Sequence, residues 1–175
     1  ALYYTNNVTS SISNTTISRN DASGTAKGIT FTPVSGTLDI VNSIIWDNST
    51  NDITRTGGTV NVSHSIYGTS NGTITNGANV FNTDPLFPDA ANEDFTISSA
   101  ASDAVDNGLL SGAPTSDIVD TIRPKGSGVD LGAFESDFII WNGPNYYVND
   151  NSFTGDIFTS DTGIDVSGCG GPTNP

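Results

Sequence analysis

The sequence predicts an all-β fold in which short strands wind into a solenoid. Three similar segments begin at Ile12, Ile40 and Val62. Self-similarity at a period of roughly 20–50 residues is typical of solenoids, because each unit is too short to bury its own apolar face and must stack on its neighbours. The units are rich in Ile, Val and Thr, turn residues separate them, and no helical spacing of apolar residues runs through the chain.

The alignment of the three segments predicts which side chains fill the interior. Successive residues of a strand point to opposite faces, so residues at matching positions stack in rows on one face. We expect two inward rows, one of Ile12, Ile40 and Val62 and the other of Ile17, Ile45 and Tyr67.

A third row contains Asn14, Asn42 and His64. Asn tolerates the left-handed conformation that a sharp bend between strands requires. We also expect the stacked amides to hydrogen-bond along the solenoid axis, about 4.8 Å apart. His64, the only histidine, has two interpretations: a substitute member of the Asn row, or a catalytic base or ligand, which would need a partner within reach.

The opposite face of the same strands predicts an apolar patch outside the solenoid, made of Ile44, Trp46 and Ile66. Such a patch is either covered by another segment or binds something. Trp46 offers a flat apolar face to a sugar ring, so the patch is a candidate carbohydrate site. The alternative is that the chain's own closing segment covers it. Arg19 and Asp47 align on neighbouring units and are expected to form a weak surface ion pair.

Residues 84–135 carry a longer pattern, from DPLFPDAANEDFTI through SDAVDNG to IRPKGSGVDLGAFE. This pattern resembles the closing segment of right-handed parallel β-helix proteins found on bacterial surfaces. The resemblance implies a right-handed parallel β-helix (solenoid) with a C-terminal closing segment and an extended tail, a fold that serves stalks, adhesins and polysaccharide enzymes alike. The matching positions are Asp84, Pro85, Leu86, Phe87, Asp89, Asp94, Phe95, Asp106, Gly108, Arg123, Gly126, Asp130, Leu131, Gly132, Ala133, Phe134 and Glu135.

The pattern divides the chain into coils over residues 1–83, a closing segment over residues 84–135, and residues 136–175. Within the closing segment we expect Arg123, Asp130 and Glu135 to form a polar clasp. Three further carboxylates should stabilise its loops by accepting backbone N–H bonds. These are Asp84, Asp89 and Asp94.

Residues 136–175 change character and have two interpretations. The run NYYVNDNSFTGDIFTSDTGID resembles the opening of another β-helix module, which would make this stretch a linker and the start of a second module. The alternative is a tail that folds back on the first module. Four carboxylates in a Gly-containing loop make calcium the best cofactor candidate, against the alternative of solvated turn residues. They are Asp150, Asp156, Asp161 and Asp165.

Composition limits the partners. A formal net charge of −14 with only five Lys and Arg argues against nucleic acid and against anionic membranes, and the sequence has no apolar run long enough to insert into a bilayer. An acidic surface keeps a long surface protein soluble and can recruit divalent cations. The sequence contains no Met and begins in mid-pattern, so we expect it to be a piece of a larger protein.

These observations lead to a functional expectation. We expect a non-catalytic structural or adhesive module of a larger extracellular or cell-surface repeat protein, one that resembles adhesins carried by the type IX secretion route. Its partners would be other modules of the parent chain, a surface polysaccharide, or a secretion or anchoring protein. The alternative is a polysaccharide-binding or polysaccharide-degrading β-helix fragment of the lyase or hydrolase type. An enzyme of that type needs a carboxylate pair or a calcium site beside a base, which the aligned coils do not predict.

Overall fold

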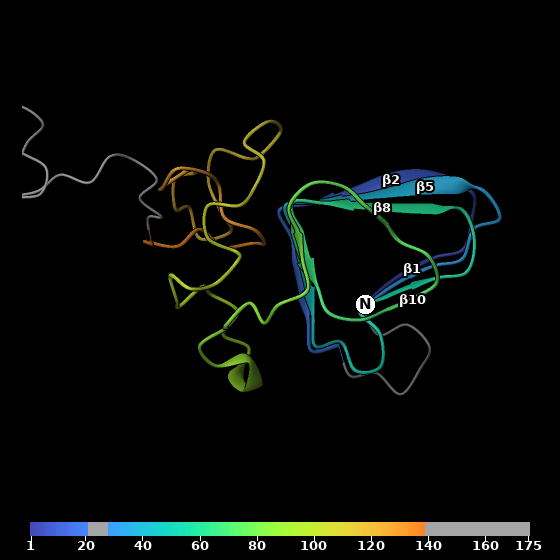
Figure 1. Cartoon of the computed structure of the whole chain (residues 1–175), viewed down its shortest axis with the longest axis horizontal. Helices are drawn as coiled ribbons and strands as arrows, with labels where there is room; N and C mark the ends of the chain where they lie inside the picture. The colour runs from blue at the N-terminus through green and yellow to red at the C-terminus, as the bar shows by residue number, and fades with distance from the viewer. Residues whose placement is uncertain (21–27, 139–175) are drawn as a thin grey trace, which may run out of the picture. The chain divides into compact units, whose positions relative to one another are not determined.

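The structure is a computed structural model that describes residues 1–20 and 28–138, all within the compact unit Ala1–Trp141. The described chain is all-β, with three parallel sheets of four strands each. The chain passes through the three sheets in turn and then repeats the passage, an arrangement consistent with a β-helix-like solenoid. Figure 1 shows β2, β5 and β8 side by side along one face.

Each pass through the three sheets is called a coil, and there are four of them among the described residues. The first sheet contains β1 (Leu2–Tyr4), β4 (Ile29–Phe31), β7 (Ile53–Arg55) and β10 (Ser70–Asn71). The second contains β2 (Val8–Ser13), β5 (Gly36–Val41), β8 (Thr59–Ser63) and β11 (Thr75–Asn76). The third contains β3 (Thr16–Ser18), β6 (Ile44–Trp46), β9 (Ser65–Tyr67) and β12 (Val80–Phe81).

The strand register confirms the two predicted inward rows. Ile12 pairs with Ile40 and Ile40 with Val62, while Ile17 pairs with Ile45 and Ile45 with Tyr67. The Ile and Val side chains of these rows are buried, and Tyr67 packs partly buried against the same interior. The interior is completed by apolar residues of the first sheet and of the start of the second, which lie in the same cluster: Ile29, Phe31, Leu38, Ile53 and Val60.

The predicted bend between the second and third sheets is also confirmed. Asn14, Asn42 and His64 have φ of 48°, 50° and 45°, which is the left-handed conformation. Asn79 has the same conformation, with a φ of 50°, and directly precedes β12, so it is a fourth member of this row. Asn79 follows His64 more closely in the sequence than His64 follows Asn42. The last coil is therefore shorter than the period from which the solenoid was predicted.

The expected hydrogen bonding between the stacked amides of this row is wrong. The Asn42 amide bonds instead to the backbone of Leu109: its Nδ2 donates to the Leu109 carbonyl at 2.8 Å, and its Oδ1 accepts from the Leu109 N–H at 2.7 Å. Among the described residues the Asn14 amide has no hydrogen-bond partner. The side chains of this bend face the closing segment, so a backbone group there competes successfully with the neighbouring amide.

A ladder of side-chain amides does form at the next bend, after the third sheet. Asn20 Nδ2 donates to Asn48 Oδ1 at 2.9 Å, and Asn48 Nδ2 donates to the carboxylate of Asp52 at 2.9 Å. Asp52 is buried and also accepts the backbone N–H groups of Asn48 and Thr69. A buried carboxylate with this many donors is a structural group that joins adjacent coils.

The closing segment has little regular structure. It contains one short 3₁₀ helix, η1 (Ala90–Asn92), and three isolated antiparallel bridges. As expected, each of its three loop carboxylates accepts a backbone N–H: Asp84 from Leu86, Asp89 from Asn92, and Asp94 from Thr96. The Asp94 carboxylate also accepts from the Thr96 hydroxyl, and these bonds, the hydroxyl one first, lower the pKa of Asp94.

Candidate functional site

The predicted apolar patch on the outer face of the third sheet is covered by the closing segment. Ile44 is 1% exposed and Ile66 is fully buried. They share an apolar cluster with four buried residues of the closing segment: Ile97, Ala104, Val105 and Leu131. Ile44 and Ile66 are therefore not accessible to a ligand. Coverage by the closing segment was one of the two outcomes expected from the sequence.

Trp46 lies at the margin of this cluster. It is partly buried and packs against the cluster together with Phe81, Phe87 and Phe138. Part of its surface remains in contact with solvent, so carbohydrate binding at Trp46 stays a prediction that involves this side chain alone.

Two backbone contacts bring the closing segment close to the coils. The N–H of Gly132 donates to the carbonyl of Asn42 at 2.8 Å, and the N–H of Ala133 donates to Thr16 Oγ1 at 3.0 Å. Gly132 has a φ of +89°, and a Cβ at this position would lie 2.9 Å from Ile44 Cδ1. Glycine is therefore required here both for the backbone conformation and for the close approach.

The three residues expected to form a clasp lie together and are buried. Arg123 donates to the carbonyls of Asp130 at 3.1 Å and Gly132 at 3.0 Å, and its Nε lies 3.6 Å from Glu135 Oε2. Glu135 accepts the N–H groups of Asp130 and Lys125. A buried guanidinium and a buried carboxylate each need several partners, and the backbone supplies two to each of them. Arg123 Nε has no hydrogen-bond partner among the described residues and meets Glu135 only as an ion pair.

Burial controls the protonation of the two clasp carboxylates. It raises the pKa of Asp130 although Ser136 and the N–H of Asp106 donate to this carboxylate. Burial likewise raises the pKa of Glu135, against the backbone N–H groups that lower it and the neighbouring Arg123 charge. For both groups burial therefore makes ionisation less favourable than it is for an exposed carboxyl.

Asp117 is a member of the clasp that the sequence analysis missed. Its Oδ1 accepts the N–H groups of Val119 and Thr121, both at 2.8 Å, and its Oδ2 accepts the N–H of Glu135 at 2.9 Å. Burial alone would raise the pKa of Asp117, but these three donors together outweigh it and hold the pKa below its ordinary value. The SD pair at Ser116–Asp117 resembles an ordinary turn in sequence, so only the fold reveals its link to Glu135.

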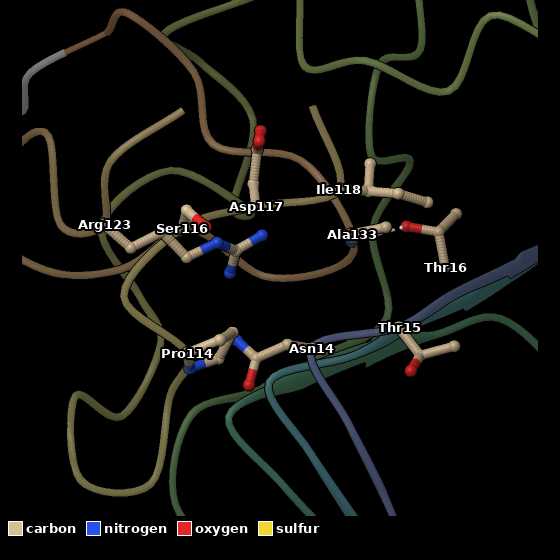
Figure 2. Close-up of a pocket in the computed structure, with 9 residues that line it drawn as sticks. All are labelled: Asn14, Thr15, Thr16, Pro114, Ser116, Asp117, Ile118, Arg123 and Ala133. Carbon is tan, nitrogen blue, oxygen red and sulfur yellow. Dashed lines mark hydrogen bonds between the residues drawn. The ribbon is translucent and has the colours of Figure 1, made fainter. Parts of the chain in front are cut away.

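A cavity of about 400 Å³ lies between the first coil and the closing segment. Its coil side is the bend at Asn14, Thr15 and Thr16, as Figure 2 shows. The closing segment lines the other side with Pro114, Ser116, Asp117, Ile118, Arg123 and Ala133. This volume is within the range of small-molecule sites.

The charged groups of this cavity are already engaged. Three backbone N–H groups occupy the Asp117 carboxylate, and two carbonyls together with Glu135 occupy Arg123. The Arg123 side chain is only 1% exposed. A general acid or base must reach the proton that it transfers, and these groups are instead held against the backbone. The cavity thus follows from the way the clasp fixes the closing segment.

The remaining candidate residues are His64, the Arg19–Asp47 pair and the four predicted calcium ligands. Nδ1 of His64 is buried without a hydrogen-bond partner among the described residues. Arg19 and Asp47 form the expected exposed ion pair, at 3.4 Å. Asp150, Asp156, Asp161 and Asp165 lie outside the described residues, and so does the predicted start of a second module. Residues 1–20 and 28–138 contain no group of three or more His, Cys, Asp or Glu placed to hold a metal ion.

Comparison with known proteins identified no relative of the chain. No family model, curated protein or solved structure matches the chain. In the part of the chain that the structure describes, no helix is both long and apolar enough to cross a membrane.

Proposed function

We propose that the chain is a right-handed parallel β-helix that acts as a non-catalytic structural or adhesive module of a larger extracellular or cell-surface repeat protein. Its partners would be other modules of the same parent chain and a surface polysaccharide or an anchoring protein. The observation that supports this proposal best is that the closing segment covers the outer apolar face of the coils and bonds to them at Asn42 and Thr16. The buried clasp of Arg123, Asp130 and Glu135 fixes the backbone of the closing segment itself.

The ionisable groups of the clasp are used for structure rather than for chemistry on a substrate. Catalytic carboxylates and bases are normally kept accessible to substrate. In the clasp, Arg123, Asp117 and Glu135 form bonds within the closing segment. These bonds fix the backbone of an irregular segment that covers the apolar face of the coils. This use of charge suits a module that has to keep its shape rather than turn over a substrate.

Two measurements test the proposal on the full chain. Antibodies raised against the chain should label intact cells that make the parent protein, and labelling only after lysis would overturn the surface location. The purified chain should release no product from a panel of neutral and acidic polysaccharides, with or without calcium. New reducing ends or unsaturated products would favour the polysaccharide-degrading alternative, and a Trp46→Ala variant would then show whether binding depends on that side chain.

A further inference from the structure

The two ends of the coil stack differ in a way that points to an interaction surface. The first coil has strands of 3, 6 and 3 residues, and the second coil repeats these lengths. The third coil has strands of 3, 5 and 3 residues, and the fourth has only 2, 2 and 2. The stack therefore tapers towards β10, β11 and β12 but keeps its full width at β1, β2 and β3.

Among the described strands, the full-width end is a strand edge with no further strand beyond it. Each of β1, β2 and β3 stands last in its sheet, with one neighbour among the described strands. Proteins protect such edges with very short strands, prolines or charges. The tapered end has very short strands, whereas the sequences of the full-width end, LYY, VTSSIS and TIS, contain no proline and no charged residue.

Burial shows the same asymmetry within single rows. Leu2 is 38% exposed, whereas its partner in the next coil, Ile29, is 1% exposed. Ile12 and Ile17 retain 7% and 8% exposure, and their partners Ile40 and Ile45 are fully buried. Leu2 is thus open to solvent at this end, and Ile12 and Ile17 are buried less completely than their partners in the next coil.

We propose that the edge formed by β1, β2 and β3 is the stacking surface for a further β-coil, which adds three parallel strands of about 3, 6 and 3 residues with aliphatic side chains pointing inward. A second copy of the chain fits less well. Stacked in parallel, it would place the two-residue β11 against the six-residue β2. This inference deepens the proposed function, on which it rests, because it names the neighbour that a structural module would hold.

A duplicate of the second coil, fused to the N-terminus, can test this proposal. Ile29 pairs with Ile53 in the next coil, and Leu2 occupies the equivalent position in the first coil. A duplicate of residues 28–51 placed directly before Ala1 therefore continues the register. Ala1→Asp is added because this position would take the role of Asp52, whose carboxylate accepts the Asn48 N–H.

The control variant contains the same duplicate with Ile40→Asp and Ile45→Asp in the added copy only, so that the native coils are untouched. We expect the first duplicate to raise the melting temperature by about 5 °C or more. We also expect it to slow exchange of β2 amides by roughly tenfold or more. Protease should remove the control duplicate. The melting temperature and the β2 amide exchange of the control should equal those of the unmodified chain.

Three results would overturn the proposal. The first is an intact duplicate that changes neither melting nor exchange. The second is β2 protection in the unmodified chain together with sedimentation as a dimer, which would make a second copy the occupant. The third is the same protection in a monomer, which would mean that the edge is already covered. Cell labelling and polysaccharide assays are independent of the duplicate, so failure of this inference is distinguishable from failure of the proposed function.

Discussion

The coils and the closing segment reach a fixed structure by different means. The coils are held by parallel backbone ladders around an aliphatic interior, and their strands repeat in register from coil to coil. The closing segment has no strand of its own among the described residues and is held by side chains that bond to its backbone, chiefly Asp117, Asp130 and Glu135. A repeated segment can thus rely on backbone pairing, whereas a segment that occurs once relies on particular side chains.

This difference predicts how each region fails. In the coils, damage should depend on whether a substitution reaches the interior, because neighbouring strands share that interior. In the closing segment, damage should depend on whether a substitution removes one of a few polar groups, and the coils should survive it. The following four predictions test this contrast, from the largest expected effect to the smallest.

Ile45→Asp should unfold the coils. Ile45 is fully buried between Ile17 and Tyr67, so the variant places an unpaired charge in the interior. We expect a loss of about 4 kcal/mol or more, a large part of the stability of a typical domain. The matched control is Ile118→Asp in the closing segment, where Ile118 is 70% exposed and the change should stay within about 0.5 kcal/mol. Urea unfolding measures both, and an Ile45→Asp variant as stable as the parent would mean that the inward register is wrong.

Arg123→Met should release the closing segment and leave the coils folded. The variant leaves the buried Glu135 carboxylate without its cation, which costs about 3–5 kcal/mol. In a Trp141→Phe background Trp46 is the only tryptophan, and its fluorescence should shift to the red as the apolar cluster opens.

Arg19→Ala is the control for that variant, because it removes an exposed ion pair worth less than about 1 kcal/mol. Strand circular dichroism should be retained in both variants. Complete unfolding of Arg123→Met would contradict the independence of the coils.

Gly132→Ala should weaken the docking of the closing segment. Its Cβ would lie 2.6 Å from Thr16 Oγ1 and 2.9 Å from Ile44 Cδ1, at a φ of +89°. Gly112→Ala is a matched control, with a φ of +83° and no atom within 4 Å of its Cβ. Strain alone should cost about 1 kcal/mol at Gly112, and the steric overlap should raise the loss to about 2–3 kcal/mol at Gly132. Equal melting temperatures would show that the close approach relaxes freely.

Asp117→Asn should cost about 1–2 kcal/mol at neutral pH, because the amide cannot accept all three backbone N–H groups as well as the carboxylate does. Its effect should fade in acid. A lowered pKa in the folded state gives stability that is present above the unfolded value near 3.8 and is lost as the pH falls through the folded pKa. Urea unfolding at several pH values measures this difference.

The unsubstituted 175-residue chain should be most stable in mild acid. The pKa values of Asp130 and Glu135 are raised above 3.8 and 4.5, so these groups subtract stability as the pH rises through their folded pKa values. The net charge of −14 acts in the same direction at neutral pH. A steady rise in stability up to neutral pH would show that Asp130 and Glu135 do not control the pH dependence of stability.

The sequence was sufficient to predict the coils because their contacts repeat at matching positions. The register of Ile12 with Ile40 and the bends at Asn14 and Asn42 follow from aligning short segments. The residues of the fourth coil were placed within the predicted coils, residues 1–83, but were not recognised as a separate coil. The short stretch between His64 and Asn79 leaves room only for two-residue strands, which carry almost no pattern.

The clasp was predicted only in part. Arg123, Asp130 and Glu135 were identified through their resemblance to a known pattern, whereas Asp117 and the Asn42–Leu109 pair were missed. The partners of the pair are 67 residues apart and belong to segments that share no repeat. A side chain that bonds to backbone leaves no complementary residue type in the sequence, so nothing at Leu109 indicates Asn42.

The connections between sheets have one further consequence, for protein engineering. The connection from β3 to β4, between Ser18 and Ile29, is longer than the one from Trp46 to Ile53, which in turn is longer than the one from Tyr67 to Ser70. The register of the sheets is unaffected by these differences, and each coil advances the stack by about 4.8 Å. Chain length at this bend is therefore independent of the spacing of the coils. We expect a foreign peptide inserted at the exposed Ser49 and Thr50, between the ladder residues Asn48 and Asp52, to be displayed at a fixed height on the stack.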